Sequence, residues 1–189
     1  MDTLVLLLKS SISLMTVFLF GSAGEIVTEK SGHLNMGIPG VMALGGLRGV
    51  LGAGTNRMNE DTVAKASQGL ATYVVKNYPN CKKIAISYDS RIKSDTFAKA
   101  AASVLAANGI KTYRFEAPHP TPELSFTVRE LNCIAGINIT ASHNPKEYNG
   151  YKAYWEDGAQ LGPEQADAVS EKIAACDIFE GVKRISLCE

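Results

Sequence analysis

Apolar runs alternate with helix-forming segments along most of the chain, and this alternation is what most constrains the fold. The runs that we expect to be strands are 83–88, 110–115, 133–139 and 150–155. The segments with the periodicity, caps and stop signals of helices are about 59–76, 94–107, 121–131 and 163–176. Strands that alternate with helices favour a parallel sheet, because each parallel connection needs a crossover. The sequence therefore predicts an α/β domain of three layers, with a mainly parallel sheet between helices.

The predicted strand 133–139 is followed by a segment that cannot continue a sheet. Residues 140–150 are rich in Asn, Pro, Glu and Gly and are expected to form a loop. In α/β domains, chemistry gathers outside the carboxyl ends of strands, so Ser142 is a candidate nucleophile. Ser142 and Asn144 are equally typical of an ordinary turn, in which they cap loop amides. No G-x-S-x-G elbow accompanies the serine, so nothing indicates a hydrolase triad.

Composition narrows the classes of partner and compartment. The chain has 189 residues, with 19 basic and 19 acidic side chains and no Lys/Arg block, so we expect no nucleic-acid partner. The four cysteines are widely separated and form no C-x-x-C pair. We therefore expect a reducing, cytoplasmic setting and no cysteine metal site.

The segment Ile139–Pro145 resembles the phosphoserine loop of the α-D-phosphohexomutases, the phosphoglucomutase/phosphomannomutase family. The other segments similar to this family, in the same order, are Gly46–Gly49, Gly52–Asn59, Tyr88–Arg91, Pro120–Pro122 and Asn149–Lys152. Together the matches extend from about Gly46 to Arg184, and the Gly52–Asn59 form is most similar to the phosphoglucomutase branch. The resemblance implies a mixed sheet of about the predicted size.

The resemblance also implies a chemistry for the loop. Ser142 would carry a phosphoryl group and exchange it between the 1- and 6-positions of a hexose phosphate, with a hexose 1,6-bisphosphate as intermediate and activator. Lys152 would be the general acid/base, and His143 would bond to the phosphate or a sugar oxygen. Arg48 and Asn144 would bind phosphate and order the loop. Because serine is a weak nucleophile, Mg²⁺ bound through the Ser142 phosphate would neutralise developing charge.

Parts of the family pattern are missing from this sequence. The resemblance implies that Mg²⁺ is shared with a second domain carrying a closely spaced aspartate triplet, and no D-x-D-x-D occurs here. We therefore expect residues 45–189 to be the first of four mutase domains, with the remaining domains as partners and with little catalysis by this chain alone. The alternative is a non-catalytic module that binds phosphate at the glycine-rich segment, where Arg57 is a further candidate contact. Glucose, mannose and pentose phosphates all remain open as substrates.

Residues 1–44 do not match the mutase pattern and are expected to form an apolar N-terminal helix. The apolar stretch 4–20 is interrupted at Lys9 and is short for a membrane span, which needs about 20 apolar residues. A signal peptide is one interpretation of this stretch. Residues 20–42 resemble the opening of nucleoside-type ABC transporter permeases. Residues 1–44 could be an insertion into a mutase, or the chain could join two unrelated segments near Gly45, and we favour the join. We expect membrane contact only through residues 4–20.

Overall fold

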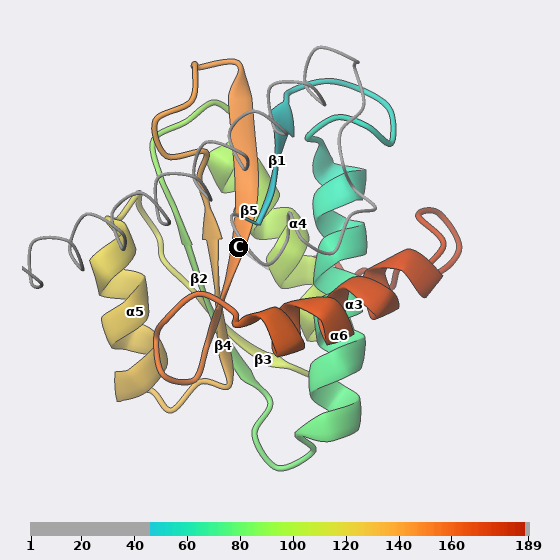
Figure 1. Ribbon diagram of the computed structural model, residues 1–189, viewed down its shortest axis with the longest axis vertical. Coiled ribbons are helices and arrows are strands. Elements are labelled where there is room, and N and C mark those ends of the chain that lie inside the picture. The colour runs from blue at the N-terminus through green and yellow to red at the C-terminus, as the bar shows by residue number, and fades with distance from the viewer. Residues whose placement is uncertain (1–45, 188–189) are drawn as a thin grey trace, which may run out of the picture. The chain divides into compact units, whose positions relative to one another are not determined.

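The computed structural model describes residues 46–187. Its elements, in chain order and with the labels of Figure 1, are β1 (Leu47–Val50), α3 (Glu60–Asn77), β2 (Lys83–Tyr88), α4 (Ser94–Ala107), β3 (Lys111–Arg114), α5 (Thr121–Glu130), β4 (Ala135–Ile139), β5 (Tyr148–Trp155) and α6 (Pro163–Ala175). The apolar N-terminal helix and the permease-like segment predicted within residues 1–44 lie outside the described residues.

The five strands form one mixed sheet in the order β1-β5-β4-β2-β3. Strand β2 pairs in parallel with β3 and β4, whereas β5 pairs antiparallel with both β4 and β1. Four strands therefore run in one direction and β5 alone opposes them (Figure 1), which confirms the prediction of a mainly parallel mixed sheet.

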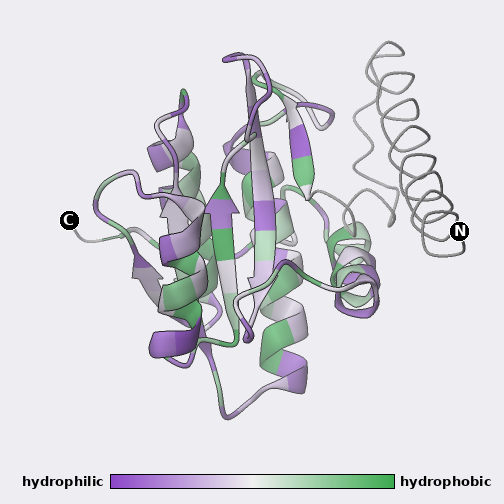
Figure 2. Ribbon diagram, turned by 60° about the vertical axis from the view of Figure 1, so that its left-hand side comes forward, coloured by the Kyte–Doolittle hydropathy of each residue, from purple (hydrophilic) through white to green (hydrophobic). Residues whose placement is uncertain are grey.

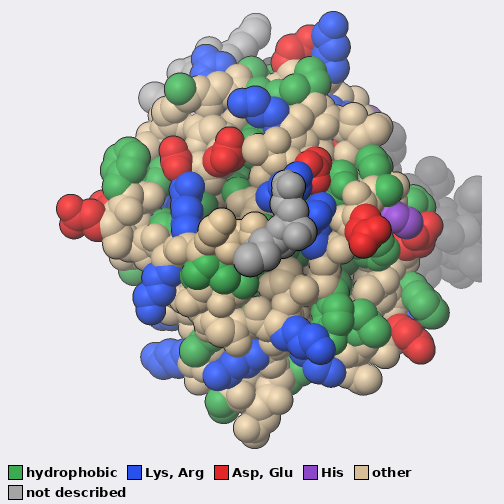
Figure 3. Space-filling model, turned by 180° about the vertical axis from the view of Figure 1, so that it is seen from behind, with side chains coloured by type: hydrophobic (Ala, Val, Ile, Leu, Met, Phe, Trp, Pro, Cys, Tyr) green, Lys and Arg blue, Asp and Glu red, His purple; other side chains and the backbone are tan. Residues whose placement is uncertain are grey.

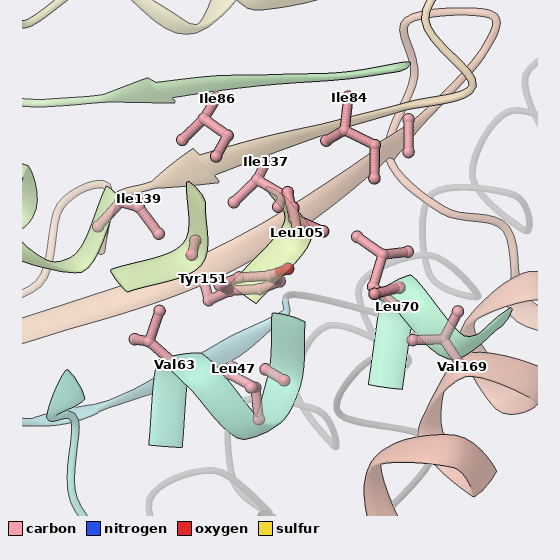
Figure 4. Close-up of a cluster of buried hydrophobic side chains, with 14 of the residues drawn as sticks. Leu47, Val63, Leu70, Ile84, Ile86, Leu105, Ile137, Ile139, Tyr151 and Val169 are labelled. Carbon is pink, nitrogen blue, oxygen red and sulfur yellow. The ribbon is translucent and has the colours of Figure 1, made fainter. Parts of the chain in front are cut away.

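Helices cover both faces of the sheet, as predicted. The helices α3, α4 and α6 share one core with alternate residues of the strands, and α5 packs on the opposite face in a smaller cluster around Leu124 and Val128. Figure 4 shows the larger core, in which strand side chains meet helix side chains, and Figure 2 shows hydrophobic and hydrophilic residues interspersed along the strands at the centre of the domain. The buried strand residues of that core include Ile84, Ile86, Ile137, Ile139 and Tyr151.

Strand β1 was not predicted, because its glycine, Gly49, was interpreted as part of the glycine-rich segment. Leu47–Val50 nevertheless alternates buried and half-buried residues and pairs with the start of β5. The bend begins only at Gly52, beyond the end of the strand. The strand prediction therefore failed where pairing with β5, a contact distant in sequence, determines the structure.

The glycine-rich loop after β1 is tied to the first turn of α3. Asn59 is the N-cap of this helix, and its Oδ1 accepts hydrogen bonds from the amides of Asp61 and Thr62. The Nδ2 of the same side chain donates to the carbonyls of Gly52, at 2.9 Å, and Gly54, at 2.8 Å. One side chain thus starts the helix and fixes the loop.

The described surface carries both signs of charge. Basic and acidic side chains are interspersed on the face shown in Figure 3, which agrees with the formal net charge of zero. Among residues 46–187, no helix has the length and apolar character required to cross a bilayer. The three cysteines in this range, Cys81, Cys133 and Cys176, are free thiols, and Cys133 is buried.

Candidate active site

The loops that follow β1, β2 and β4 lie at one edge of the sheet, because these three strands run in the same direction (Figure 1). This is the carboxyl edge, where ligands usually bind in open α/β sheets. Ser142 lies in the loop after β4, and residues 89–91 follow β2. The antiparallel strand β5 begins at the same edge and brings Lys152 back along β4.

Ser142 and Lys152 form a direct pair. The Lys152 amine donates to Ser142 Oγ at 2.8 Å. Lys152 lies opposite Asn138 of β4, so its side chain points away from the core face to which the preceding residue, Tyr151, contributes. Burial, and then the like charge of Arg48, lowers the pKa of the Lys152 amine below its ordinary value. At a given pH, a larger fraction of Lys152 is therefore in the neutral amine form than for a solvated lysine. This neutral form can accept a proton from serine.

The other predicted site residues are placed differently from one another. Arg48, on β1, donates from Nη1 to Asn144 Oδ1 at 3.1 Å, so this pair links the edge strand to the serine loop. His143 is exposed beside Ser142, and its side chain has no hydrogen bond within residues 46–187. Arg57 is also exposed, and its side chain lies against Gly52. The structure therefore brings together four of the five predicted site residues, with His143 adjacent and unengaged.

The backbone of Ser142 is in the left-handed region, with φ of 55°. A non-glycine residue in this region costs roughly 1–2 kcal/mol and persists only where its surroundings impose it. Inside the loop, the Ser142 amide donates to Thr140 Oγ1 at 2.9 Å, and the Asn144 amide donates to the carbonyl of Ala141 at 3.1 Å. Strain of this kind clusters at functional positions, where it fixes the direction of a reactive side chain.

Arg91 is a site residue to which the sequence analysis assigned no role, although its segment Tyr88–Arg91 was among the family matches. Its guanidinium donates to four backbone carbonyls between residues 142 and 148, in and just after the loop that carries Ser142. The available signal was its place directly after a predicted buried strand, at the same edge as Ser142.

A cleft of about 480 Å³ opens beside the serine. It is lined by residues 89–92 together with Ser142, Asn144 and Lys146. Ser142 is thus shared by the cleft and by the contact with Lys152. The cationic side chains of Arg91 and Lys146 favour an anionic occupant such as a phosphate ester.

The residues present do not by themselves form a magnesium cage. In the part of the chain that the structure describes, no three His, Cys, Asp or Glu side chains group closely enough to hold a metal. The nearby carboxylate of Asp89 is already paired with Arg91, at 3.4 Å. Mg²⁺ requires several oxygen ligands. From this site it would receive only the phosphate oxygens of a phosphorylated Ser142.

Gly150 permits the close approach of three strands behind the serine loop. A Cβ at this position would lie 2.6 Å from the carbonyl oxygen of Thr140 and 2.8 Å from that of Leu47, both of them backbone atoms. We expect Gly150→Ala to lower the free energy of unfolding by about 1–3 kcal/mol, measured by urea denaturation, because the strands must separate. The control is Gly162→Ser, where an added Cβ meets only the flexible end of Gln165. If the urea midpoint of Gly150→Ala equalled that of the wild type, β1 would move aside without loss of stability.

The fold and the site define an α/β domain that presents a serine to an anionic ligand. Residues 42–178 match the family domain described as phosphoglucomutase/phosphomannomutase, alpha/beta/alpha domain I. The chain therefore belongs to the phosphoglucomutase/phosphomannomutase family, as the sequence resemblance indicated. Nothing in the comparisons supports the permease resemblance of the first 44 residues.

Among curated relatives, the chain is 45% identical over 148 residues to a phosphoglucomutase of Staphylococcus saprophyticus, covering 77% of this chain and 27% of that one. It is 46% identical over 133 residues to a probable phosphoribomutase of Schizosaccharomyces pombe, covering 69% of this chain and 22% of the relative. A putative phosphomannomutase from Thermus thermophilus superposes with a TM-score of 0.63 at 31% identity, over 68% of this chain and 28% of that structure. The chain spans about a quarter of the length of these relatives.

Proposed function

We propose that this domain supplies the phosphoryl-carrying serine of a phosphohexomutase, which moves a phosphoryl group between the 1- and 6-positions of a hexose phosphate. Ser142 carries the group, and a hexose 1,6-bisphosphate is the intermediate and activator. The observation that carries the proposal is the 2.8 Å contact of the Lys152 amine with Ser142 Oγ, made by a lysine whose pKa is lowered. A surface lysine in solvent would show neither feature.

In the proposed reaction, Ser142 Oγ attacks phosphorus as the neutral Lys152 amine takes the serine proton. The bond between phosphorus and a sugar oxygen of the bisphosphate breaks, and the leaving sugar oxygen takes a proton from water. In the reverse step, the bond between phosphorus and Ser142 Oγ breaks as a bond to a sugar hydroxyl oxygen forms. The sugar hydroxyl releases its proton to water, and protonated Lys152 returns a proton to the serine. Arg48 stabilises the anionic group and keeps the lysine pKa low. Transfer of this kind depends mainly on positioning and charge neutralisation, which this cationic edge provides.

Mg²⁺ is part of the proposal as a charge-neutralising ion held through the Ser142 phosphate and shared with a second mutase domain. The other mutase domains and a phosphosugar substrate are likewise proposed partners. Because the curated relatives include both a phosphoglucomutase and a probable phosphoribomutase, the sugar is to be determined by experiment.

A non-catalytic phosphate-binding module is the second candidate. It is favoured by the cations Arg48, Lys146 and Lys152 near Ser142, in the absence of a metal-holding acidic group among residues 46–187. Such a module would bind a sugar phosphate tightly and leave the serine unmodified.

A domain exchange tests the proposal. Residues 46–178 would replace the matching domain of the Staphylococcus saprophyticus phosphoglucomutase, to which the chain is 45% identical. We expect the chimera to interconvert glucose 1-phosphate and glucose 6-phosphate and to carry a phosphoryl group on Ser142, located by peptide mass spectrometry. A folded chimera that binds glucose 1,6-bisphosphate but never contains phosphoserine would support the binding module instead.

A further inference from the structure

The guanidinium of Arg91 makes four hydrogen bonds to backbone carbonyls and one ion pair. Nη2 donates to the carbonyls of Ser142 and Asn144, both at 2.7 Å. Nη1 donates to the carbonyls of Pro145, at 2.9 Å, and Tyr148, at 3.2 Å. Nε faces Asp89 Oδ2 at 3.4 Å. A guanidinium has five N–H groups and no acceptor, so the carbonyls take four donors of Arg91, and the fifth, at Nε, faces the Asp89 carboxylate.

The four carbonyls extend from Ser142, in the loop between β4 and β5, to Tyr148, the first residue of β5. The first belongs to Ser142 itself, whose left-handed backbone would relax without an external constraint. Hydrogen bonds from a charged donor are about twice as strong as neutral ones, and the Arg91 side chain is only 15% exposed, so water competes poorly for these carbonyls. Arg91 is therefore placed to set the conformation of the loop.

Arg91 is itself held by a chain of side chains that reaches the far end of the loop. Asp89 Oδ1 accepts from the Arg91 amide at 3.0 Å and from Ser94 Oγ at 2.9 Å. Ser94 Oγ in turn accepts from Asn149 Nδ2 at 3.0 Å, in a buried contact. Asn149 lies three residues before Lys152 on β5, so the same network connects the serine loop with the strand that carries its lysine.

We propose that Arg91 is a positioning residue: it holds Ser142 in the left-handed conformation and thereby aims Oγ at Lys152. It acts through backbone carbonyls and does not touch the substrate. Its catalytic consequence rests on the proposed function of Ser142, because a displacement of about 1 Å at a reacting atom can cost on the order of a hundredfold in rate. The effect of Arg91 on the conformation of Ser142 does not depend on whether Ser142 carries a phosphoryl group.

The test uses the whole chain and reads the geometry of the loop by nuclear magnetic resonance. The ¹³Cα and ¹³Cβ shifts and the HN–Hα coupling of Ser142 report its φ angle, and amide exchange at Asn144 and Tyr148 reports the order of the loop. For Arg91→Ala we expect loss of the left-handed signature and amide exchange faster by roughly tenfold or more, as for lost hydrogen bonds to a charged group. Methylguanidinium should restore part of both signals.

Two variants make the outcome decisive. Arg129→Ala removes an exposed arginine on α5 and should leave the Ser142 signals unchanged. Arg91→Lys keeps the charge but offers three donors from one point, and it should restore at most part of the loop order; it decides the question if Arg91→Ala fails to fold. Retention of the Ser142 signature and amide protection in both Arg91 variants would overturn the proposal. Because phosphoryl transfer is not measured, that failure would leave the role of Ser142 untouched.

Discussion

Ser142→Ala is expected to abolish turnover in the domain-exchange chimera, with a loss of about a thousandfold or more in kcat and no phosphorylated peptide. Without Oγ there is no nucleophile to form the covalent intermediate, and the remaining site only binds and orients. The Lys152 amine also loses its partner at 2.8 Å. Turnover is measured by coupling glucose 6-phosphate to its dehydrogenase, and phosphorylation by intact mass.

Ser90 provides the matched control for this prediction. It also lines the cleft and is exposed, but it lies in the loop after β2 and has no recorded contact with Lys152 among residues 46–187. Ser90→Ala should keep most of the turnover. If Ser90→Ala were inactive and Ser142→Ala active, Ser90 would be the nucleophile. If both variants turned over normally, a covalent phosphoserine would have no part in the reaction.

The helices and most strands were predictable because their signals are local. Asn59 caps α3 at the start of a predicted helix, and the buried runs of β2 and β4 are mostly apolar, with Ser87 and Asn138 as their buried polar residues. Strand β1 was not predictable in the same way. Its four residues include a glycine, and its conformation depends on antiparallel pairing with β5, about a hundred residues later. Local propensity has little influence where strand pairing between distant residues determines whether a strand forms.

The site shows the same division between local pattern and tertiary contact. The sequence indicated that Ser142 would lie at a strand exit, and the resemblance associated Lys152 with it. The structure adds the strand register that brings the two together. The function of Arg91 depends on hydrogen bonds to carbonyl groups more than fifty residues away in the sequence. Every residue has a backbone carbonyl, so the amino-acid sequence does not indicate which carbonyls Arg91 contacts. His143 illustrates the converse, since a residue implied by a motif has no hydrogen bond here within residues 46–187.

Lys152→Met is expected to slow phosphorylation of Ser142 by about a hundred- to ten-thousandfold, the usual range for loss of a general acid or base. The substitution keeps the length and apolar stem of the side chain, so the fold should be retained. The rate is measured in single turnover with the chimera and glucose 1,6-bisphosphate. Lys146→Met is the control, because this lysine lines the cleft without a recorded bond to the serine. Equal losses in the two variants would indicate a general effect of charge.

The pH dependence separates proton transfer from charge. Phosphorylation of Ser142 requires the neutral amine, so the wild-type rate should rise with pH towards the lowered pKa of Lys152. Arg48→Gln removes the like charge that helps to lower this pKa, so the pKa should rise and the rising limb should move to higher pH. Lys152→Arg keeps a positive charge that does not titrate in this range, and its rate should be low and nearly independent of pH. If Lys152→Arg instead kept the wild-type rate and pH profile, the lysine would act only as a cation and the serine proton would leave by another route.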